Sequence, residues 1–157
     1  NVPVPMPATA QKYTFHSVLS DALEEECSFD VVCEVREKIC DIISGNKEIK
    51  NDDDHVAVSK NIVKHVLRDC GVSEEKVENF GQKYDEEFGK GNDILPENIV
   101  NTKQFEIKTP DVQIRVNPEK EDLVDVRVID GVKYVLVRAE DGVEVNGVFI
   151  NISKDEE

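Results

Sequence analysis

Apolar side chains in the first part of the chain recur every three or four positions, the spacing of one buried face of an α-helix. One such stripe occupies residues 9–26. After a short polar break, a second stripe occupies residues 29–44 and ends at Gly45 and Asn46, where a left-handed C-cap is expected. The pattern therefore predicts two consecutive amphipathic helices.

Two shorter stripes follow, each preceded by a serine whose hydroxyl can cap a helix N-terminus. Ser59 precedes one stripe and Ser73 precedes the other, which ends at Gly89. Gly81 interrupts the second of these stripes and suggests the close approach of a neighbouring segment. Four helices are thus predicted within residues 9–89.

Beyond a connection at residues 90–101, the hydrophobic period falls to two, the period of β-strands. Within residues 102–152 the apolar parity switches after Pro110 and Asp111, which predicts a bend or bulge. The stretch Leu123 to Ile129 is apolar at nearly every second position. It is predicted to be a central strand of a five- or six-stranded antiparallel sheet.

Dipeptides that favour hairpin turns separate the later strands. Asp130-Gly131 supplies both positive-φ positions of a type I′ turn, and Asp141-Gly142 and Asn146-Gly147 repeat the signal. Short turns between successive strands are typical of a meander. The predicted fold class is α+β, an N-terminal four-helix segment followed by an antiparallel β-meander sheet, with the helices either covering one sheet face or forming a separate bundle.

These patterns predict an order of segments along the chain. The first has prolines at alternate positions, which disfavour regular structure, and the last is rich in acidic residues. The segments are a linker at 1–8, a helical subdomain at 9–89, the connection at 90–101, the β subdomain at 102–152 and an acidic tail at 153–157.

The charge balance is strongly negative, with 34 acidic and 19 basic side chains among 157 residues and a formal charge of -15. Direct contact with nucleic acid is not expected, because such binding depends on Lys and Arg replacing phosphate counterions. We find no apolar run of membrane-spanning length and no signal-peptide pattern, so a cytoplasmic location is expected. The sequence starts at Asn1 and its one methionine is Met6, which suggests a piece of a longer polypeptide.

The four cysteines, Cys27, Cys33, Cys40 and Cys70, lack the close pairing of a zinc site and are expected to be thiols. A metal site made from the first three is the alternative, but thiols that pack as small apolar groups are favoured. The sequence predicts no cofactor.

Histidines beside carboxylates are the other candidates for chemistry. His65 and Asp69 lie four apart on a predicted helix, a spacing open to two metal ligands or an acid/base couple, although a solvated helix face also produces it. His16 is expected to be packed or half-exposed. His55 follows three aspartates that lack the glycine and distant glutamate of a calcium loop. We predict no catalytic or metal-binding residue among them.

The segment from Val66 to Val77 has a turn between two predicted helices that resembles the turn of a helix-turn-helix DNA-binding motif. The N-terminal end of its second helix, however, carries Glu74, Glu75 and Glu78, which would face phosphates with Lys76 as the offsetting cation. A helical hairpin is the favoured interpretation.

A likeness to a known family is carried by three stretches: SVLSDALEEECSFDVV (Ser17 to Val32), IVNTKQFEIKTPDVQIRVNPEKEDLVDVRVIDGVKYVLV (Ile99 to Val137) and VEVNG (Val143 to Gly147). They resemble the C-terminal half of a family of clostridia and other Firmicutes described as a domain of unknown function. Full-length members are longer on the N-terminal side. The resemblance implies no activity, cofactor or catalytic residue.

A second similarity joins Phe105 to Val137 to the C-terminal β region of bacterial nucleoid-associated proteins. It implies association with the nucleoid or with nucleic acid through another segment. We expect a non-enzymatic protein-interaction or regulatory module of a larger cytoplasmic protein, whose partner is the absent N-terminal region or another protein. A nucleoid-associated module and an unrecognised enzyme are the alternatives.

Overall fold

The structure is a computed structural model that describes residues 6–140 and 142–152. It has an α+β fold and divides into two compact units, residues 1–102 and 103–157. The first part of the expected linker, residues 1–5, and the expected acidic tail, residues 153–157, lie outside the described residues.

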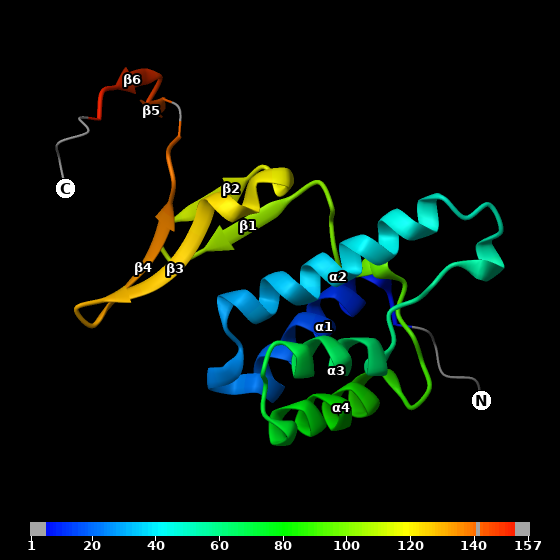
Figure 1. The fold of residues 1–157 in the computed structure, drawn as a ribbon. Helices are drawn as coiled ribbons and strands as arrows, with labels where there is room; N and C mark the ends of the chain where they lie inside the picture. The colour runs from blue at the N-terminus through cyan, green and yellow to red at the C-terminus, as the bar shows by residue number, and fades with distance from the viewer. Residues whose placement is uncertain (1–5, 141, 153–157) are drawn as a thin grey trace. The chain divides into compact units, whose positions relative to one another are not determined.

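Helices make up the described part of residues 6–102 (Figure 1). The α-helices are α1 (Ala8–Leu23), α2 (Phe29–Lys47), α3 (Lys60–Asp69) and α4 (Glu74–Phe88). Three 3₁₀ helices, Glu24–Glu26, Asp52–Asp54 and Pro96–Asn98, accompany them, so this part contains more helical segments than the expected four. The first predicted helix is divided, because α1 ends at Leu23 and a 3₁₀ turn completes the stretch.

A capping side chain marks the start of α3 but not the start of α4. The Ser59 hydroxyl accepts a hydrogen bond from the Ile62 N–H (3.2 Å), as its position predicts. Ser73 occupies the N-cap position of α4 as expected, but its side chain makes no capping bond, because its hydroxyl donates instead to Glu26 (2.7 Å) and its N–H donates to the same carboxylate (2.8 Å). These two hydrogen bonds hold the pKa of the Glu26 carboxyl below its usual range.

The end of α2 also differs from the expectation of a left-handed cap at Gly45 and Asn46. Neither residue has a positive φ, and the helix continues to Lys47. Asn46 is buried, and its side-chain amide accepts from the Val56 N–H and donates to the Val56 carbonyl, both at 2.8 Å. These two hydrogen bonds link the loop that follows α2 back to the helix. They therefore stabilise the helical conformation of Asn46.

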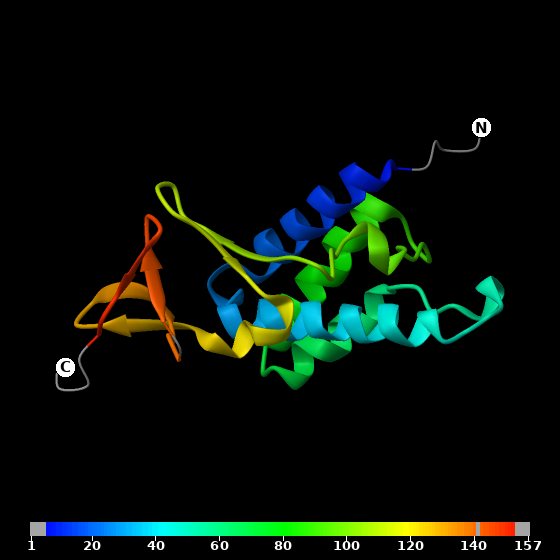
Figure 2. The same cartoon turned by 90° about the horizontal axis from the view of Figure 1, so that it is seen from above.

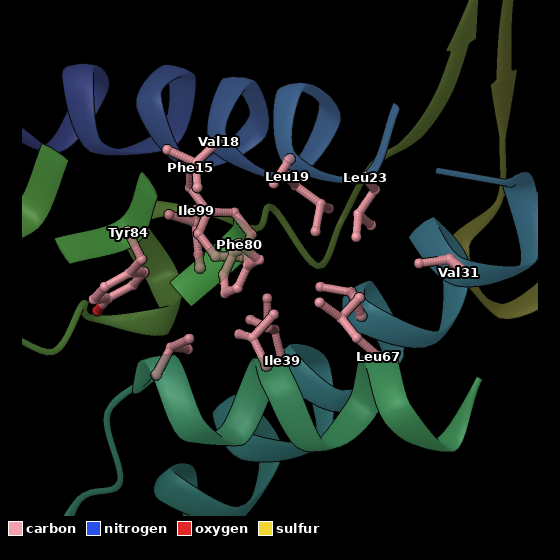
Figure 3. Packing of buried hydrophobic residues seen from close by; sticks show 14 of the residues in the cluster. Phe15, Val18, Leu19, Leu23, Val31, Ile39, Leu67, Phe80, Tyr84 and Ile99 are labelled. Carbon is pink, nitrogen blue, oxygen red and sulfur yellow. The ribbon is translucent and has the colours of Figure 1, made fainter. Parts of the chain in front are cut away.

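One apolar core fills the helical unit (Figure 3). Phe80 is fully buried, and its ring packs edge-on against Phe15 with 6.3 Å between ring centroids. Ile94 and Ile99 belong to the same core, although residues 90–101 were expected to be only a connection. Paired backbone bonds between Val58 and Ile94, both 2.8 Å, fix this segment in place.

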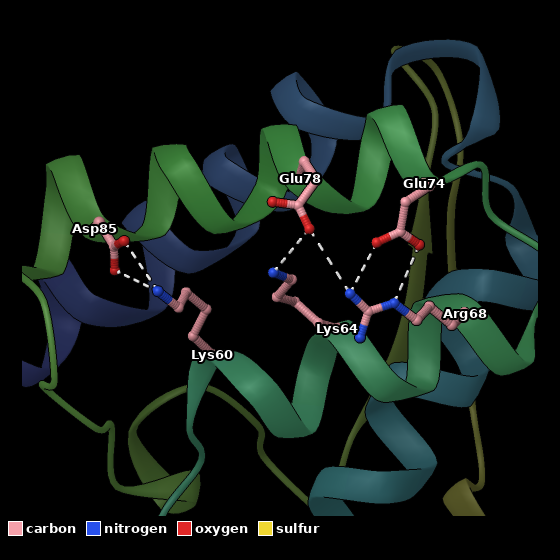
Figure 4. A network of polar contacts seen from close by, with 6 residues as sticks. All are labelled: Lys60, Lys64, Arg68, Glu74, Glu78 and Asp85. Carbon is pink, nitrogen blue, oxygen red and sulfur yellow. Dashed lines mark hydrogen bonds and ion pairs between the residues drawn. The ribbon is translucent and has the colours of Figure 1, made fainter.

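Helices α3 and α4 form a hairpin joined by three ion-paired positions (Figure 4). Lys60 pairs with Asp85 at 2.9 Å, Lys64 with Glu78 at 3.1 Å and Arg68 with Glu74 at 2.9 Å. The cations recur every four residues, so they share one face of α3. Gly81 lies on the facing side of α4, where an added Cβ would meet Lys64 at 3.4 Å. Side chains of α3 thus lie against Gly81, but at an ordinary van der Waals distance from an added Cβ.

The second unit contains three separate antiparallel hairpins (Figure 2). Their strands are β1 (Phe105–Lys108), β2 (Gln113–Val116), β3 (Val124–Ile129), β4 (Val132–Val137), β5 (Val143–Val145) and β6 (Val148–Ile150). Across the described residues, β1 pairs with β2, β3 with β4 and β5 with β6. The predicted single meander is therefore wrong, and β3 is an edge strand rather than a central one.

Local turns explain why the strands pair only in twos. Asp130 and Gly131 have φ of 52° and 79°, which confirms the type I′ turn between β3 and β4. The expected bend at Pro110 and Asp111 is a full chain reversal, in which the Thr109 N–H donates to the Val112 carbonyl (2.8 Å).

Between the first two hairpins, a 3₁₀ helix at Pro118–Leu123 replaces the tight turn that a meander needs. Asn146 and Gly147 also have positive φ and reverse the chain between β5 and β6. Asp141 lies outside the described residues, so the turn expected at Asp141-Gly142 lies partly outside them as well.

Candidate functional site

The β3–β4 hairpin has one face made almost entirely of valine. Residues directly opposite in the register share a face, and Val124 pairs with Val137, Val126 with Val135, and Val128 with Lys133. We call this set, with Lys133 at its end near the turn, the valine face: Val124, Val126, Val128, Lys133, Val135 and Val137.

Much of the valine face is open to solvent. Val128 is 67% exposed, Val137 is 52% exposed and Val126 is 41% exposed. Isolated exposed valines are ordinary on protein surfaces, but contiguous apolar patches mark contact sites. The register makes these side chains contiguous.

The opposite face of β3 carries an ion pair. Arg127 Nε lies 2.6 Å from Asp125 Oδ2, and Asp125 Oδ1 accepts from the Val126 N–H at 2.9 Å. The Arg127 guanidinium holds the pKa of the Asp125 carboxyl below its usual range. The Asp125 carboxylate is therefore favoured over its protonated form.

The backbone phase of the hairpin shows which groups face outward. The Arg138 N–H donates to the Leu123 carbonyl at 2.8 Å, so this opposed pair is hydrogen-bonded. In an antiparallel ladder, hydrogen-bonded and non-bonded pairs alternate. The backbone groups of Val124, Val126 and Val128 therefore point away from β4, which agrees with the bond from the Val126 N–H to Asp125.

The other two hairpins repeat the pattern of one aliphatic face. In β1–β2 the register opposes Ile107 to Ile114, and in β5–β6 it opposes Val143 to Ile150 and Val145 to Val148. Ile150 is 44% exposed and Val148 is 63% exposed. Two-stranded sheets are marginally stable alone, so faces of this kind favour contact with other protein surface.

The helical unit contains a groove of about 700 Å³ between α2 and α3. Five carboxylates line it: Asp30, Glu34, Glu37 and Asp41 of α2 and Asp69 of α3. Lys38 and His65 are its basic side chains. The groove therefore attracts cations.

The one thiol among the described residues that line the groove is not activated. Cys70 lines it, and burial raises the pKa of the thiol, with further contributions from Glu34, Asp69 and Asp30. The thiolate form is disfavoured at neutral pH. His65 Nε2 lies 3.4 Å from Asp69 Oδ2 with both side chains mostly exposed, so the predicted pair forms on the helix surface.

The structure separates the other candidates for chemistry. All four cysteines are present as thiols, as expected, and burial raises the pKa of Cys27. No group of three or more His, Cys, Asp or Glu side chains able to hold a metal occurs in the described residues, which include Cys33 and Cys40.

The two remaining histidines make local contacts. His55 donates from Nε2 to the Ile49 carbonyl at 2.9 Å, outside the groove. Partial burial lowers the pKa of His16, and Lys12 lowers it further, while a hydrogen bond to the Ile99 backbone opposes both effects.

The segment that resembles a DNA reader is the α3–α4 hairpin. The carboxylates of Glu74 and Glu78 lie against Arg68 and Lys64 of the preceding helix. Lys76 pairs with Glu24 at 3.1 Å. These cations already have anionic partners within the chain.

Sequence reasoning identified β3 but missed its open edge and its charged pair. The signal was present in the run Val-Asp-Val-Arg-Val at 124–128, which reads the same in both directions except for the sign of its charges. This run indicates a site for strand pairing only if β3 is an edge strand, because the backbone groups of a central strand are already hydrogen-bonded on both sides.

Comparison with known proteins gives one family and no individual relative. The model of a family described as "Domain of unknown function (DUF4317)" matches residues 1–148. No curated protein and no solved structure matches the chain. Within the residues that the structure describes, every helix is too short or too polar to cross a membrane.

Proposed function

The chain belongs to the DUF4317 family, and we propose that it is a non-enzymatic protein-interaction module of a larger cytoplasmic protein. The contact element is the β3–β4 hairpin, and the partner is another protein molecule that covers the valine face. In keeping with the resemblance noted in the sequence, we propose that this chain comes from a Firmicutes bacterium.

The observation that supports this proposal most is the exposed part of the valine face, which comprises Val126, Val128 and Val137, while Val124 at its other end is 5% exposed. Burying apolar area contributes about 25 cal/mol per Å² removed from water, so covering Val126, Val128 and Val137 favours association. Lys133 places one charged side chain at the turn end of the face. Apolar contacts bordered by polar side chains are common in protein interfaces.

Two other functions have less support. A nucleoid-associated module would need cations to meet phosphate, but Lys60, Lys64 and Arg68 are paired with carboxylates of α4. An enzyme would need convergent groups of perturbed ionisation in a cavity. In the α2–α3 groove, Cys70 is shifted away from reactivity.

A photo-crosslinking side chain placed in the full-length protein tests the proposal. Position 128 lies on the valine face, and position 134 of β4 lies on the opposite face of the same hairpin, away from the outer edge of β3, which makes it a matched control. We expect irradiation in the cells that make the protein to give a discrete protein adduct from position 128 and little from position 134. Equal adducts from both positions, or none from position 128, would contradict it.

A further inference from the structure

We propose that the outer edge of β3 pairs antiparallel with β3 of a second copy of this chain, centred on Val126, so that two hairpins become one four-stranded sheet. This inference rests on the proposed function in taking the same hairpin as the contact element. It goes further by naming the partner and by using the strand edge as well as the valine face.

Charge complementarity selects a second copy as the partner. If Val126 lies opposite its counterpart, Asp125 of each copy lies opposite Arg127 of the other, and Val124 lies opposite Val128. Between Val124 and Val128, every directly opposed pair is then valine with valine or acid with base. Opposite charges and β-branched residues both stabilise cross-strand pairs, whereas like charges oppose pairing. Strand β3 is thus complementary to itself in this register.

The backbone groups have the phase that this register needs. Val124, Val126 and Val128 direct their N–H and C=O groups to the open edge. Centring on Val126 makes the two Val126 residues a hydrogen-bonded pair, in which each N–H donates to the other carbonyl. Val128 N–H then donates to the Val124 carbonyl of the second copy. Val124 N–H takes no part, because it donates to the Glu121 carbonyl.

In the unpaired chain, the Asp125 carboxylate bonds to the strand edge where the second copy would pair. It accepts from the outward Val126 N–H at 2.9 Å and pairs with Arg127 at 2.6 Å. In the paired state, the Val126 N–H donates to the Val126 carbonyl of the other copy instead of to Asp125. Asp125 then pairs with Arg127 of the other copy instead of with Arg127 of its own strand. The exchange leaves every charged group partnered, and it joins the two valine faces into one.

The first experiment removes one edge donor and leaves the hairpin ladder intact. Val126→Pro deletes the outward N–H, and Val135→Pro makes the same change on the outer edge of β4, directly opposite. Sedimentation of the full chain up to roughly 1 mM covers a weak strand-pairing dimer. We expect wild type and Val135→Pro to reach twice 17.7 kDa and Val126→Pro to stay monomeric.

The second experiment reads the register through charge. Arg127→Asp opposes Asp to Asp, and Asp125→Arg opposes Arg to Arg, so each variant alone should dimerise roughly tenfold more weakly or worse. Mixing the two variants pairs Asp with Arg at both positions and should restore a heterodimer. The doubly exchanged chain, Asp125→Arg with Arg127→Asp, should again form a homodimer. Restoration also shows that the single variants are folded.

The outcomes separate this inference from the proposed function. A wild-type chain that stays monomeric, a Val126→Pro variant that dimerises like wild type, or a variant mixture without heterodimer would each overturn β3 self-pairing. If crosslinks from position 128 persist in such a case and lead to a different protein, the interaction module stands with another partner. If those crosslinks are absent too, both proposals fail.

Discussion

Tyr84 shows how one buried polar side chain couples the helical core to pH. The residue is 1% exposed, and its hydroxyl donates to the Asn92 carbonyl at 2.6 Å. Burial raises the pKa of Tyr84 to about 12, with Asp93 and Asp85 adding to the effect. The folded state therefore favours the neutral phenol.

The sign of the resulting pH dependence follows from linkage. The phenol contributes its full stability below pH 10, its ordinary pKa, and that contribution is lost as pH rises toward 12. We expect a loss of about 2–3 kcal/mol over this window. Urea unfolding from pH 9 to 12 measures it. Tyr84→Phe should lose much less over the same window, while Tyr13→Phe, at a side chain 76% exposed, should behave like wild type.

Asn46 is a second residue with an effect beyond its own helix. Asn46→Ala removes two hydrogen bonds to Val56 from a buried position and should lower the free energy of unfolding by about 1–3 kcal/mol. Asn117→Ala is the control, because Asn117 caps an exposed 3₁₀ helix through one bond and should cost about 1 kcal/mol or less. Equal losses in urea titrations would count against a clamping role for Asn46.

Residue-level expectations held where the partner is local in sequence. The Ser59 cap needs only the N–H three residues later, so the sequence contains all the information. Ser73 has the same local context, but Glu26 reaches it from 47 positions away. Asn46 likewise bonds across a loop. Hydrogen-bond partners that the fold brings together from distant positions cannot be predicted from the local sequence.

At the scale of elements, the α3–α4 hairpin combines an apolar seam with an ionic one. The Lys60–Asp85 pair is the most shielded, with side chains 29% and 21% exposed. A double-mutant cycle with Lys60→Met and Asp85→Asn should give a coupling of about 0.5–1 kcal/mol. The same cycle on Lys64 and Glu78, where the carboxylate is 55% exposed, should give a smaller coupling that disappears in concentrated salt. A larger coupling for the second pair would contradict this ranking.

The elements themselves were largely visible in the sequence because their signals are local. The helical periods located all four α-helices, and Asp130-Gly131 located the β3–β4 turn. What failed was the assembly of strands. Alternation specifies which face of a strand is apolar, but pairing between hairpins depends on connections such as the 3₁₀ helix at Pro118–Leu123, whose conformation the alternation does not encode.

At the scale of the whole molecule, the two units differ in how completely they bury their apolar residues. The helical unit has a closed core in which Phe80 and Leu67 are fully buried. In the β unit, strands that the sequence marks as apolar keep side chains such as Val128 and Phe149 exposed, at 67% and 75%. The net charge of -15 keeps the chain dispersed without covering these faces. A protein partner would cover them.

The candidate site was only half accessible from the sequence. The valines of β3 follow from alternation, and so do the charges of Asp125 and Arg127 between them. Their proposed use as a docking edge depends on β3 having one neighbouring strand, a non-local property that the predicted meander excluded.

Amide exchange in the full chain, followed by NMR as its concentration is raised, tests the docking edge most directly. The amides of Val126 and Val128 point outward, whereas that of Arg127 lies within the β3–β4 ladder and serves as the internal reference. If a second copy completes the sheet, exchange at Val126 and Val128 slows as concentration rises, while exchange at Arg127 changes much less. Exchange at the two outward amides that is equally fast at every concentration would contradict it.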